Sequence, residues 1–259
     1  MPVSAQEFAL LRHFTSRALR ERFEGTLTGA GWAVLQPLIM LGVYSLLFVT
    51  VLRARLPESI GLGFVPFLAV GLWPWTAFAE SLTQGTTAIQ DNASLLSKVA
   101  LPRAVLVLSR VAAAFALHAL GFVLILVLLA ALGHPLKWSG LPIALGLMCL
   151  LAIAAAGLAL ALAAIQVFVR DLAQIIGQVL TVGFFLTPIF YPREMLPERL
   201  RPVLDANPMT AFVEAFRWSL FGAGEPGFGW WALLWFPPAA LALGWFVFQR
   251  LSKHFEDFL

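Results

Sequence analysis

Six stretches of this 259-residue chain contain no aspartate, glutamate, lysine or arginine over a length that could cross a lipid bilayer. An ionised side chain at mid-bilayer costs at least about 2.5–3.5 kcal/mol on insertion scales, and one helical span needs roughly 18 or more apolar residues. The six stretches are residues 25–52, 59–79, 111–136, 138–169, 172–192 and 226–249. They predict an all-α integral membrane protein with six transmembrane helices. The stretch 138–169 could hold two spans only with a tight turn, for which Gly146 and Gly157 are weak evidence.

The composition also indicates that lipid, and not water, surrounds most of the chain. Hydrophobic residues make up 60% of the chain and charged residues 12%, whereas charge is near a quarter in soluble domains. The apolar content extends over nearly the whole chain, so residues 1–259 are expected to form one membrane domain. A net charge of +3 without a long basic block argues against nucleic-acid binding. Cys149 is the one cysteine, which excludes an intrachain disulfide and argues against a thiolate metal cluster.

Basic residues predict the orientation of the spans. With an even number of crossings both termini lie on one side, and lysine and arginine favour the cytoplasm. The N-terminal segment and the loop after the second stretch carry much of the positive charge, at Arg12, Arg17, Arg20, Arg22, Lys98, Arg103 and Arg110. Both termini are therefore expected in the cytoplasm, with the chain in the inner membrane. The first apolar run starts too late and is too long for a cleaved signal peptide.

The N-terminal segment, about residues 4–24, predicts an amphipathic helix lying in the cytoplasmic interface. Ser4 and Glu7 have the spacing of a capping box. Apolar side chains recur on roughly one face, at Phe8, Leu11, Phe14, Ala18 and Phe23. Such a helix would hold a charged face near the membrane for a partner protein. The alternative is a solvated leader with accidental periodicity.

The second stretch combines helix-breaking and polar features. Pro66 and Pro74 predict a kinked or irregular outer half. Just beyond the stretch, Glu80 shares a helical face with a set of polar residues, Thr76, Thr83 and Gln84. Its carboxylate could line a polar path, or it could snorkel toward the interface.

Two connections are more than simple turns. The polar loop of about residues 85–103 contains Leu95, Leu96 and Val99, which could form the apolar edge of a short helix that needs a protein or lipid cover, or packs under the chain's own bundle. Five prolines between residues 188 and 208 exclude an uninterrupted transmembrane helix there. Together with the helical pattern over 210–221, they predict two short helices outside the membrane or dipping into it.

Catalytic motifs do not emerge from the sequence. It contains no Gly-rich phosphate loop ending in Gly-Lys-Ser/Thr, no His-Glu-x-x-His and no Gly-x-Ser-x-Gly. His118 lies well inside a span, but as the one histidine there it is expected to be a neutral residue bonded to a neighbour. A hydrolase would need an acid and a base at matching depth, and the sequence alone does not pair them.

Four short segments resemble the permeases of type-2 ABC exporters, and within them the branch that exports lipid-linked polysaccharides such as O-antigen and teichoic acid. They are Asn92-Ala-Ser-Leu-Leu-Ser-Lys-Val-Ala-Leu-Pro-Arg103, Val169-Arg-Asp-Leu172, Thr187-Pro-Ile-Phe-Tyr-Pro192 and Ala206-Asn-Pro-Met209. The resemblance implies a homodimeric permease with two separate ATPase subunits, which would bind the ATP and Mg²⁺ that this chain does not. It also implies that the first and fifth spans border the translocation path.

The resemblance assigns roles to two sets of residues. Coupling to the ATPase is implied for a helix over about 92–99 and its surroundings, with Asn92, Leu95, Leu96, Lys98, Val99, Pro102, Arg103, Arg17 and Arg20. An extracytoplasmic gate is implied for about residues 193–225, with Pro192, Pro197, Asn207 and Pro208 as its marker positions.

A polysaccharide path also has a physical requirement, because sugar rings pack their C–H faces on aromatic side chains. The candidates are Tyr44, Phe48, Trp73, Trp75, Phe78, Phe184, Phe185, Phe190 and Tyr191. The alternative for each of them is lipid contact or packing between helices. At the level of the whole chain the alternatives are an exporter permease for a drug or a lipid, a membrane enzyme, or a scaffold.

Overall fold

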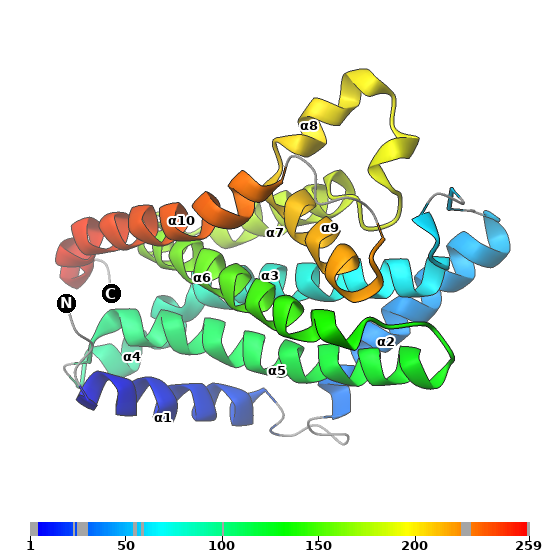
Figure 1. Ribbon diagram of the computed structural model, residues 1–259. Helices are drawn as coiled ribbons and strands as arrows, with labels where there is room; N and C mark the ends of the chain where they lie inside the picture. Colours follow the sequence, from blue (N-terminus) through cyan, green and yellow to red (C-terminus); the bar gives the residue numbers. More distant parts are fainter. Residues whose placement is uncertain are drawn as a thin grey trace.

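The computed structural model describes residues 5–22, 24, 31–53, 56–57, 60–99, 101–223 and 229–257. Within these ranges the regular structure is helical throughout, without a β-strand. Four long helices lie side by side in Figure 1, namely α3 (Phe64–Asp91), α5 (Arg103–Ala131), α6 (Leu141–Gln166) and α10 (Trp230–Leu251). The prediction of an all-α protein is confirmed.

Glycines allow the long helices to approach closely. A Cβ at Gly244 of α10 would fall on the backbone of Gly157 in α6, and a Cβ at Gly157 would fall on the backbone of Ala240. Between α3 and α6, a Cβ at Gly85 would lie 2.6 Å from the Cβ of Ala159. Small residues at helix contacts are typical of membrane bundles, where lipid is as apolar as a side chain and close packing drives association.

Three helices among the described residues are long and apolar enough to cross a membrane: Arg103–Ala131, Trp138–Gln166 and Trp230–Phe255. The second of these includes the 3₁₀ turn η4 (Trp138–Gly140), so the stretch 138–169 forms one helix and not two. The first stretch forms α2 (Trp32–Ser45) and the π-helical η2 (Leu46–Val51). Residues 25–30, which begin this stretch, lie outside the described ranges.

The remaining predicted spans are a shorter helix and a more polar one. The fifth stretch forms α7 (Leu172–Leu186), which is apolar but only 15 residues long. The second stretch forms α3, which continues through Pro74 and is long enough for a crossing at 28 residues, but carries Glu80 and a polar C-terminal end. Residues 226–228 of the last stretch lie outside the described ranges.

The N-terminal helix is α1 (Ala5–Glu21), and it lies along α5. Arg110 of α5 donates to Glu21 of α1 over 3.3 Å. On the predicted apolar face Ala18 is buried, whereas Phe8 is 65% exposed. Ser4 of the capping box and Phe23 of that face lie outside the described residues.

The helix α3 corrects the predicted loop of residues 85–103. It runs on to Asp91, so that the connection to α5 is only residues 92–102, with the single-turn helix α4 (Ala93–Leu96) inside it. Polar residues do not stop a helix by themselves, and the hydroxyl of Thr86 bonds to the carbonyl of Leu82 along the helix. The chain leaves the helix at Asn92, and Pro102 precedes the first turn of α5.

The proline-rich segment contains no long helix, as predicted, but it and the stretch after it form four short helical pieces and not two. After α7 the chain forms η5 (Arg193–Met195), η6 (Glu198–Leu200) and α8 (Arg201–Asp205). The helix α9 (Pro208–Phe221) follows, begins at the side-chain cap of Asn207 and ends at Gly222 in the left-handed conformation, φ 70°. Residues 224–225 of the predicted gate segment lie outside the described ranges.

The bundle has two distinct ends in Figure 1. The start of α1, the helix α4 and the end of α10, followed by η7 (Ser252–Asp257), lie at one end. The helices α8 and α9 lie toward the other end, near the start of α10. Loops of different character therefore occupy opposite ends of the bundle.

Candidate functional site

A cavity of about 430 Å³ lies between α2, α3, α5 and α7, next to Arg22 just after α1. Its wall on α3 is one helical face, with Leu72, Trp75, Thr76, Ala79, Glu80, Thr83 and Gln84. Aromatic side chains gather at the Trp75 part of this face, where the rings of Trp75 and Phe184 are 6.0 Å apart. Charged and polar side chains gather at the Glu80 part. The cavity is amphiphilic along its length.

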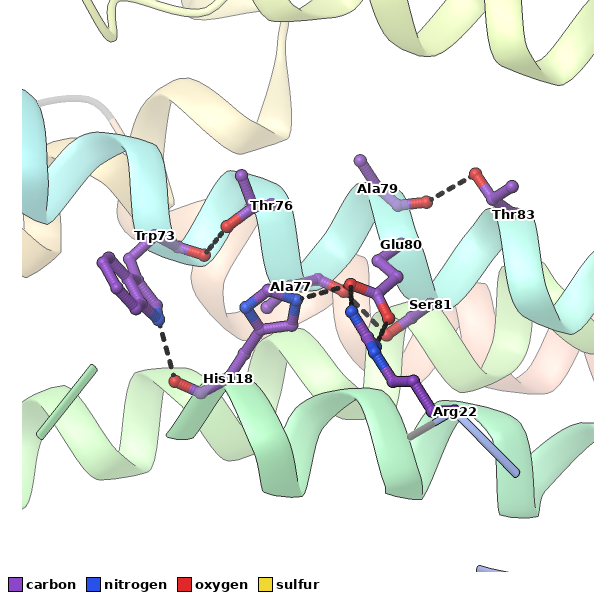
Figure 2. Close-up of polar contacts among 9 residues, drawn as sticks. All are labelled: Arg22, Trp73, Thr76, Ala77, Ala79, Glu80, Ser81, Thr83 and His118. Atoms are coloured by element: carbon purple, nitrogen blue, oxygen red, sulfur yellow. Dashed lines mark hydrogen bonds and ion pairs between the residues drawn. The ribbon is translucent and has the colours of Figure 1, made fainter. Parts of the chain in front are cut away.

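Glu80 is the centre of the polar part (Figure 2). Both terminal nitrogens of Arg22 bond to its carboxylate, Nη1 to Oε1 and Nη2 to Oε2, the second at 3.0 Å. The Nε2 of His118 lies 2.8 Å from Oε2. A forked guanidinium–carboxylate pair of this kind fixes orientation as well as charge.

The three groups come from segments that are far apart in the sequence. Glu80 lies in the middle of α3 and His118 in the middle of α5, while Arg22 follows α1. The carbonyl of His118 accepts a bond from Trp73 Nε1 at 3.0 Å, which fixes α5 against α3 at this level. Glu80 therefore faces the cavity and its two partners.

A second cavity of about 140 Å³ lies on the α1 side of the ion pair. It shares Arg22, Glu80 and Gln84 with the larger cavity, and Ala18 and Arg110 contribute to its wall. The Arg22–Glu80 pair thus forms part of the wall between the two spaces.

Three of the nine predicted path aromatics line the larger cavity, namely Tyr44, Trp75 and Phe184. Four others extend this ring cluster beyond the cavity wall, with the Phe48–Phe190 centroids 5.1 Å apart, the Phe185–Phe190 centroids 6.1 Å apart, and Tyr191 donating to the Phe185 carbonyl.

Trp73 and Phe78 are placed differently. Both are buried, and neither contributes to the wall of the cavity. The ring of Trp73 packs against Gly121 of α5, where a Cβ would lie 2.7 Å from it. These two aromatics are in packing positions between helices.

The predicted coupling residues lie around α4. Asn92 closes α3, its side chain donating to the carbonyl of Ala88 at 2.9 Å. Leu95 and Leu96 are half-buried, Lys98 and Val99 are exposed, and Pro102 precedes α5. Arg103 bonds to the carbonyl of Ser252, and its guanidinium lies 5.5 Å from the ring centre of Phe255.

The other two predicted coupling residues lie on α1 and not in this loop. Arg17 pairs with Glu21 one turn along the helix at 2.6 Å, and Arg20 is exposed. The structure therefore divides the predicted coupling set between the exposed surface of α1 and the α4 loop.

The broken segment is held together by arginines. Arg217 of α9 is buried and donates to three carbonyls, those of Phe67 at 3.2 Å, Pro188 at 2.8 Å and Ile189 at 3.0 Å. Its guanidinium lies 3.4 Å from the ring centre of Phe67. Burial also raises the pKa of Glu214 on α9 to about 7, with the positive charge of Arg217 acting in the opposite direction.

The predicted gate positions lie at the ends of the short helices. Pro192 and Pro197 precede η5 and η6, and Pro208 is the first residue of α9. Asn207 joins the two parts of the segment, because its amide donates to Thr187 Oγ1 at 3.0 Å. Arg193 and Asp205 form a forked pair at 2.5–2.6 Å, and this hydrogen bond raises the pKa of Arg193.

Sequence reasoning missed two of these groups. It paired no acid with a base, whereas Glu80 and His118 are in contact. It also did not single out Arg217, whose side chain is buried. The signal available for the first pair was the rule that an ionisable group inside a span needs a partner.

Comparison with known proteins identifies the family. Residues 9–221 match the model of a family described as ABC-2 type transporter. The chain belongs to the ABC-2 type transporter family. The match covers the cavity, the α4 loop and the broken segment up to the last residue of α9, so each part of the site lies inside the portion shared with other ABC-2 type transporters.

Related proteins resemble this ABC-2 type transporter over most of its length. An O-antigen export system permease protein RfbA from Klebsiella pneumoniae is 30% identical over 97% of the chain and 95% of that protein. A second protein of the same name from this organism is 28% identical over the same shares. One from Myxococcus xanthus is 35% identical over 80% of the chain and 78% of its own length.

Proposed function

We propose that this chain is the permease subunit of an ABC exporter that carries a lipid-linked polysaccharide of the O-antigen class across the cytoplasmic membrane. The observation that carries the proposal is the 30% identity to an O-antigen export permease over 97% of the chain. The membrane-length helices agree with this role. Energy would come from the hydrolysis of ATP, which a separate ATPase subunit would bind together with Mg²⁺.

The amphiphilic cavity is the proposed part of the translocation path. Sugar rings expose apolar C–H faces and hydrogen-bonding hydroxyls, and the cavity offers both kinds of partner. Tyr44, Trp75 and Phe184 supply aromatic surface, while Thr76 and Glu80 supply polar atoms on the wall of the same cavity. The proposed lining includes three of the nine aromatic residues predicted from the sequence.

The proposed assembly is a homodimer of this chain with two ATPase subunits. Each copy would cross the membrane six times, with α2 and η2, α3 and α7 completing the three apolar spans. Both termini and the α4 loop would lie on the cytoplasmic side, where residues 92–99 and the basic face of α1 would meet the ATPase. The segment from Pro192 to α9 would close the outer end.

The test uses the permease co-expressed with its ATPase subunit. Replacing Tyr44, Trp75 and Phe184 together by alanine should lower glycan export at least tenfold while the ATPase still co-purifies. Trp235→Ala is the matched control, because this tryptophan is 66% exposed on α10 and outside the cavity. Stimulation of the ATPase by an apolar drug or a simple lipid, and not by lipid-linked glycan, would instead favour the alternative exporter.

A further inference from the structure

A buried glutamine at the end of α6 has all its side-chain polar groups satisfied. Gln166 is 2% exposed. Its Nε2 donates to Gln90 Oε1 at 3.0 Å and to the Arg170 carbonyl at 2.9 Å, and its Oε1 accepts from the backbone N–H of Ala173 at 2.8 Å. Gln90 in return donates to the Gln166 carbonyl at 3.0 Å.

The two glutamines join three helices, α3, α6 and α7. Gln90 lies in the last turn of α3, two residues before the α4 loop. Gln166 ends α6, and through Ala173 it fixes the first turn of α7. The same α7 carries Phe184, Thr181 and Leu180 of the cavity wall. The contact thus connects the base of the α4 loop to a wall of the cavity.

The contact resists sliding for a physical reason. A buried polar group that loses its partner is costly, so the end of α3 cannot move away from the end of α6 without leaving the groups of this contact unpaired. Neutral amides with reciprocal bonds are also specific in distance and direction. A displacement of the α4 loop is therefore passed to α7 more readily than it is absorbed between them.

We propose, on the basis of the function proposed above, that Gln90 and Gln166 are positioning residues that couple movement of the α4 loop to α7. The ATPase would displace the loop, and the glutamine pair would make the start of α7 follow, which changes the cavity near Phe184. Neither glutamine touches the transported molecule in this scheme. Their effect is on how much transport each ATP hydrolysed produces.

The two glutamines can be separated by mutation. Gln90→Leu removes the tie to α3 but keeps the bonds of Gln166 to Arg170 and Ala173, so the α6–α7 turn stays intact. Gln166→Leu removes the three bonds made by the Gln166 side chain and leaves the one that Gln90 donates to the backbone carbonyl of residue 166. Gln249→Leu is the matched control, because Gln249 is an exposed glutamine at the inner end of α10.

The measurement is glycan exported per ATP hydrolysed, with permease and ATPase reconstituted together in lipid vesicles. Gln90→Leu is expected to keep assembly and basal ATPase activity within about twofold and to lower export per ATP about tenfold or more. Gln249→Leu should match the wild type. Because the two glutamines share one contact, the loss of export per ATP in the double variant should be smaller than the product of the two single losses.

Wild-type export per ATP in Gln90→Leu would overturn the proposal. Should that variant fail to assemble, Gln90→Glu tests the same contact, since it keeps the acceptor for Gln166 Nε2 and loses the donor; unchanged export per ATP there would also overturn it. Failure of the proposed function looks different, because the wild-type chain itself would then show no glycan-dependent ATP hydrolysis.

Discussion

Glu80 shows how a charge is accommodated inside an otherwise apolar bundle. Removing a carboxylate from water is costly unless hydrogen bonds and an opposite charge replace the solvent. Arg22 supplies the opposite charge through two nitrogens, and His118 supplies a further contact. The same pair separates two cavities, so its stability also bears on the shape of the path.

Removal of the Glu80 carboxylate is expected to destabilise the folded protein. Glu80→Ala leaves the partly buried guanidinium of Arg22 without an anion, which costs on the order of 1–3 kcal/mol. The charge swap Arg22→Glu with Glu80→Arg should recover part of that loss. Thermal unfolding of the purified protein in detergent measures both effects.

A surface arginine provides the control for this comparison. Arg250→Ala changes an exposed residue at the end of α10 and should shift the unfolding midpoint little. If Glu80→Ala unfolds at the wild-type temperature, the pair has no structural role and the interpretation of the cavity wall fails.

The sequence supports part of this cluster. The spacing of Thr76, Glu80, Thr83 and Gln84 predicts one helical face, and the structure places all four on the cavity wall. The partners of Glu80 could not be predicted, because Arg22 is 58 residues and His118 is 38 residues away in the chain. Periodicity identifies a face, but the helix opposite that face depends on tertiary packing.

Among the elements, α9 carries one side chain, Arg217, that holds neighbouring segments in place. The chain between α7 and η5 is irregular, so its carbonyls need donors from elsewhere. Arg217 satisfies those of Pro188 and Ile189 and also bonds to Phe67 at the start of α3. One guanidinium therefore fixes three segments at this end of the bundle.

Arg217→Lys is expected to loosen this end although it keeps the charge. A lysine ammonium cannot reproduce a planar fork aimed at three carbonyls, so at least one buried carbonyl loses its donor, at a cost of about 1–3 kcal/mol. Limited proteolysis of the segment around α8 should become faster. Arg199→Lys, at an exposed position, is the control, and equal cleavage rates in the two variants would contradict the role of Arg217.

The contact between α6 and α10 gives a sharper prediction about helix packing. In Gly244→Ala the added Cβ would meet the backbone of Gly157, so the two helices must separate, which costs on the order of 1–3 kcal/mol. Gly146→Ala on α6 meets nothing within 4 Å and should be neutral or slightly stabilising, because alanine is the better helix former. Unfolding midpoints of the two variants test this difference, and equal midpoints would contradict it.

The ends of the helices could not be predicted from the charge-free stretches. Charges mark where a chain leaves the hydrocarbon, but they do not end a helix. The helix α5 begins at Arg103, eight residues before the charge-free stretch, and α3 continues to Asp91 beyond its stretch. Prolines were more informative, because α7 ends directly before the segment in which they cluster.

At the scale of the whole molecule, exposed faces differ between helices. The outward face of α10 is apolar over its membrane-length part, with Leu234, Trp235, Leu243 and Phe246 each about 60% exposed or more. On α7, Gln174, Gln178 and Thr181 are exposed at spacings of four and three residues, which places them on one face. The hydrocarbon of the bilayer covers an apolar face readily, but it offers no hydrogen bonds to glutamine.

The polar stripe on α7 therefore predicts that a second copy of the chain, or the aqueous path between two copies, covers this helix. Composition could predict membrane insertion, and resemblance could predict a dimer, but neither could distinguish the faces of α7 and α10. That distinction needed the packing of the bundle, which buries one side of each helix and leaves the other to its surroundings.

Cysteine cross-linking tests the prediction directly. In a Cys149→Ala background, which removes the exposed native thiol, Gln174→Cys and Gln178→Cys should give dimers with a short thiol cross-linker in membranes. Leu243→Cys should remain monomeric, since lipid separates that face of α10 from any other copy. Dimers formed at Leu243→Cys, with the α7 cysteines unreacted, would place the second copy against α10. That result would contradict the prediction that the second copy covers α7.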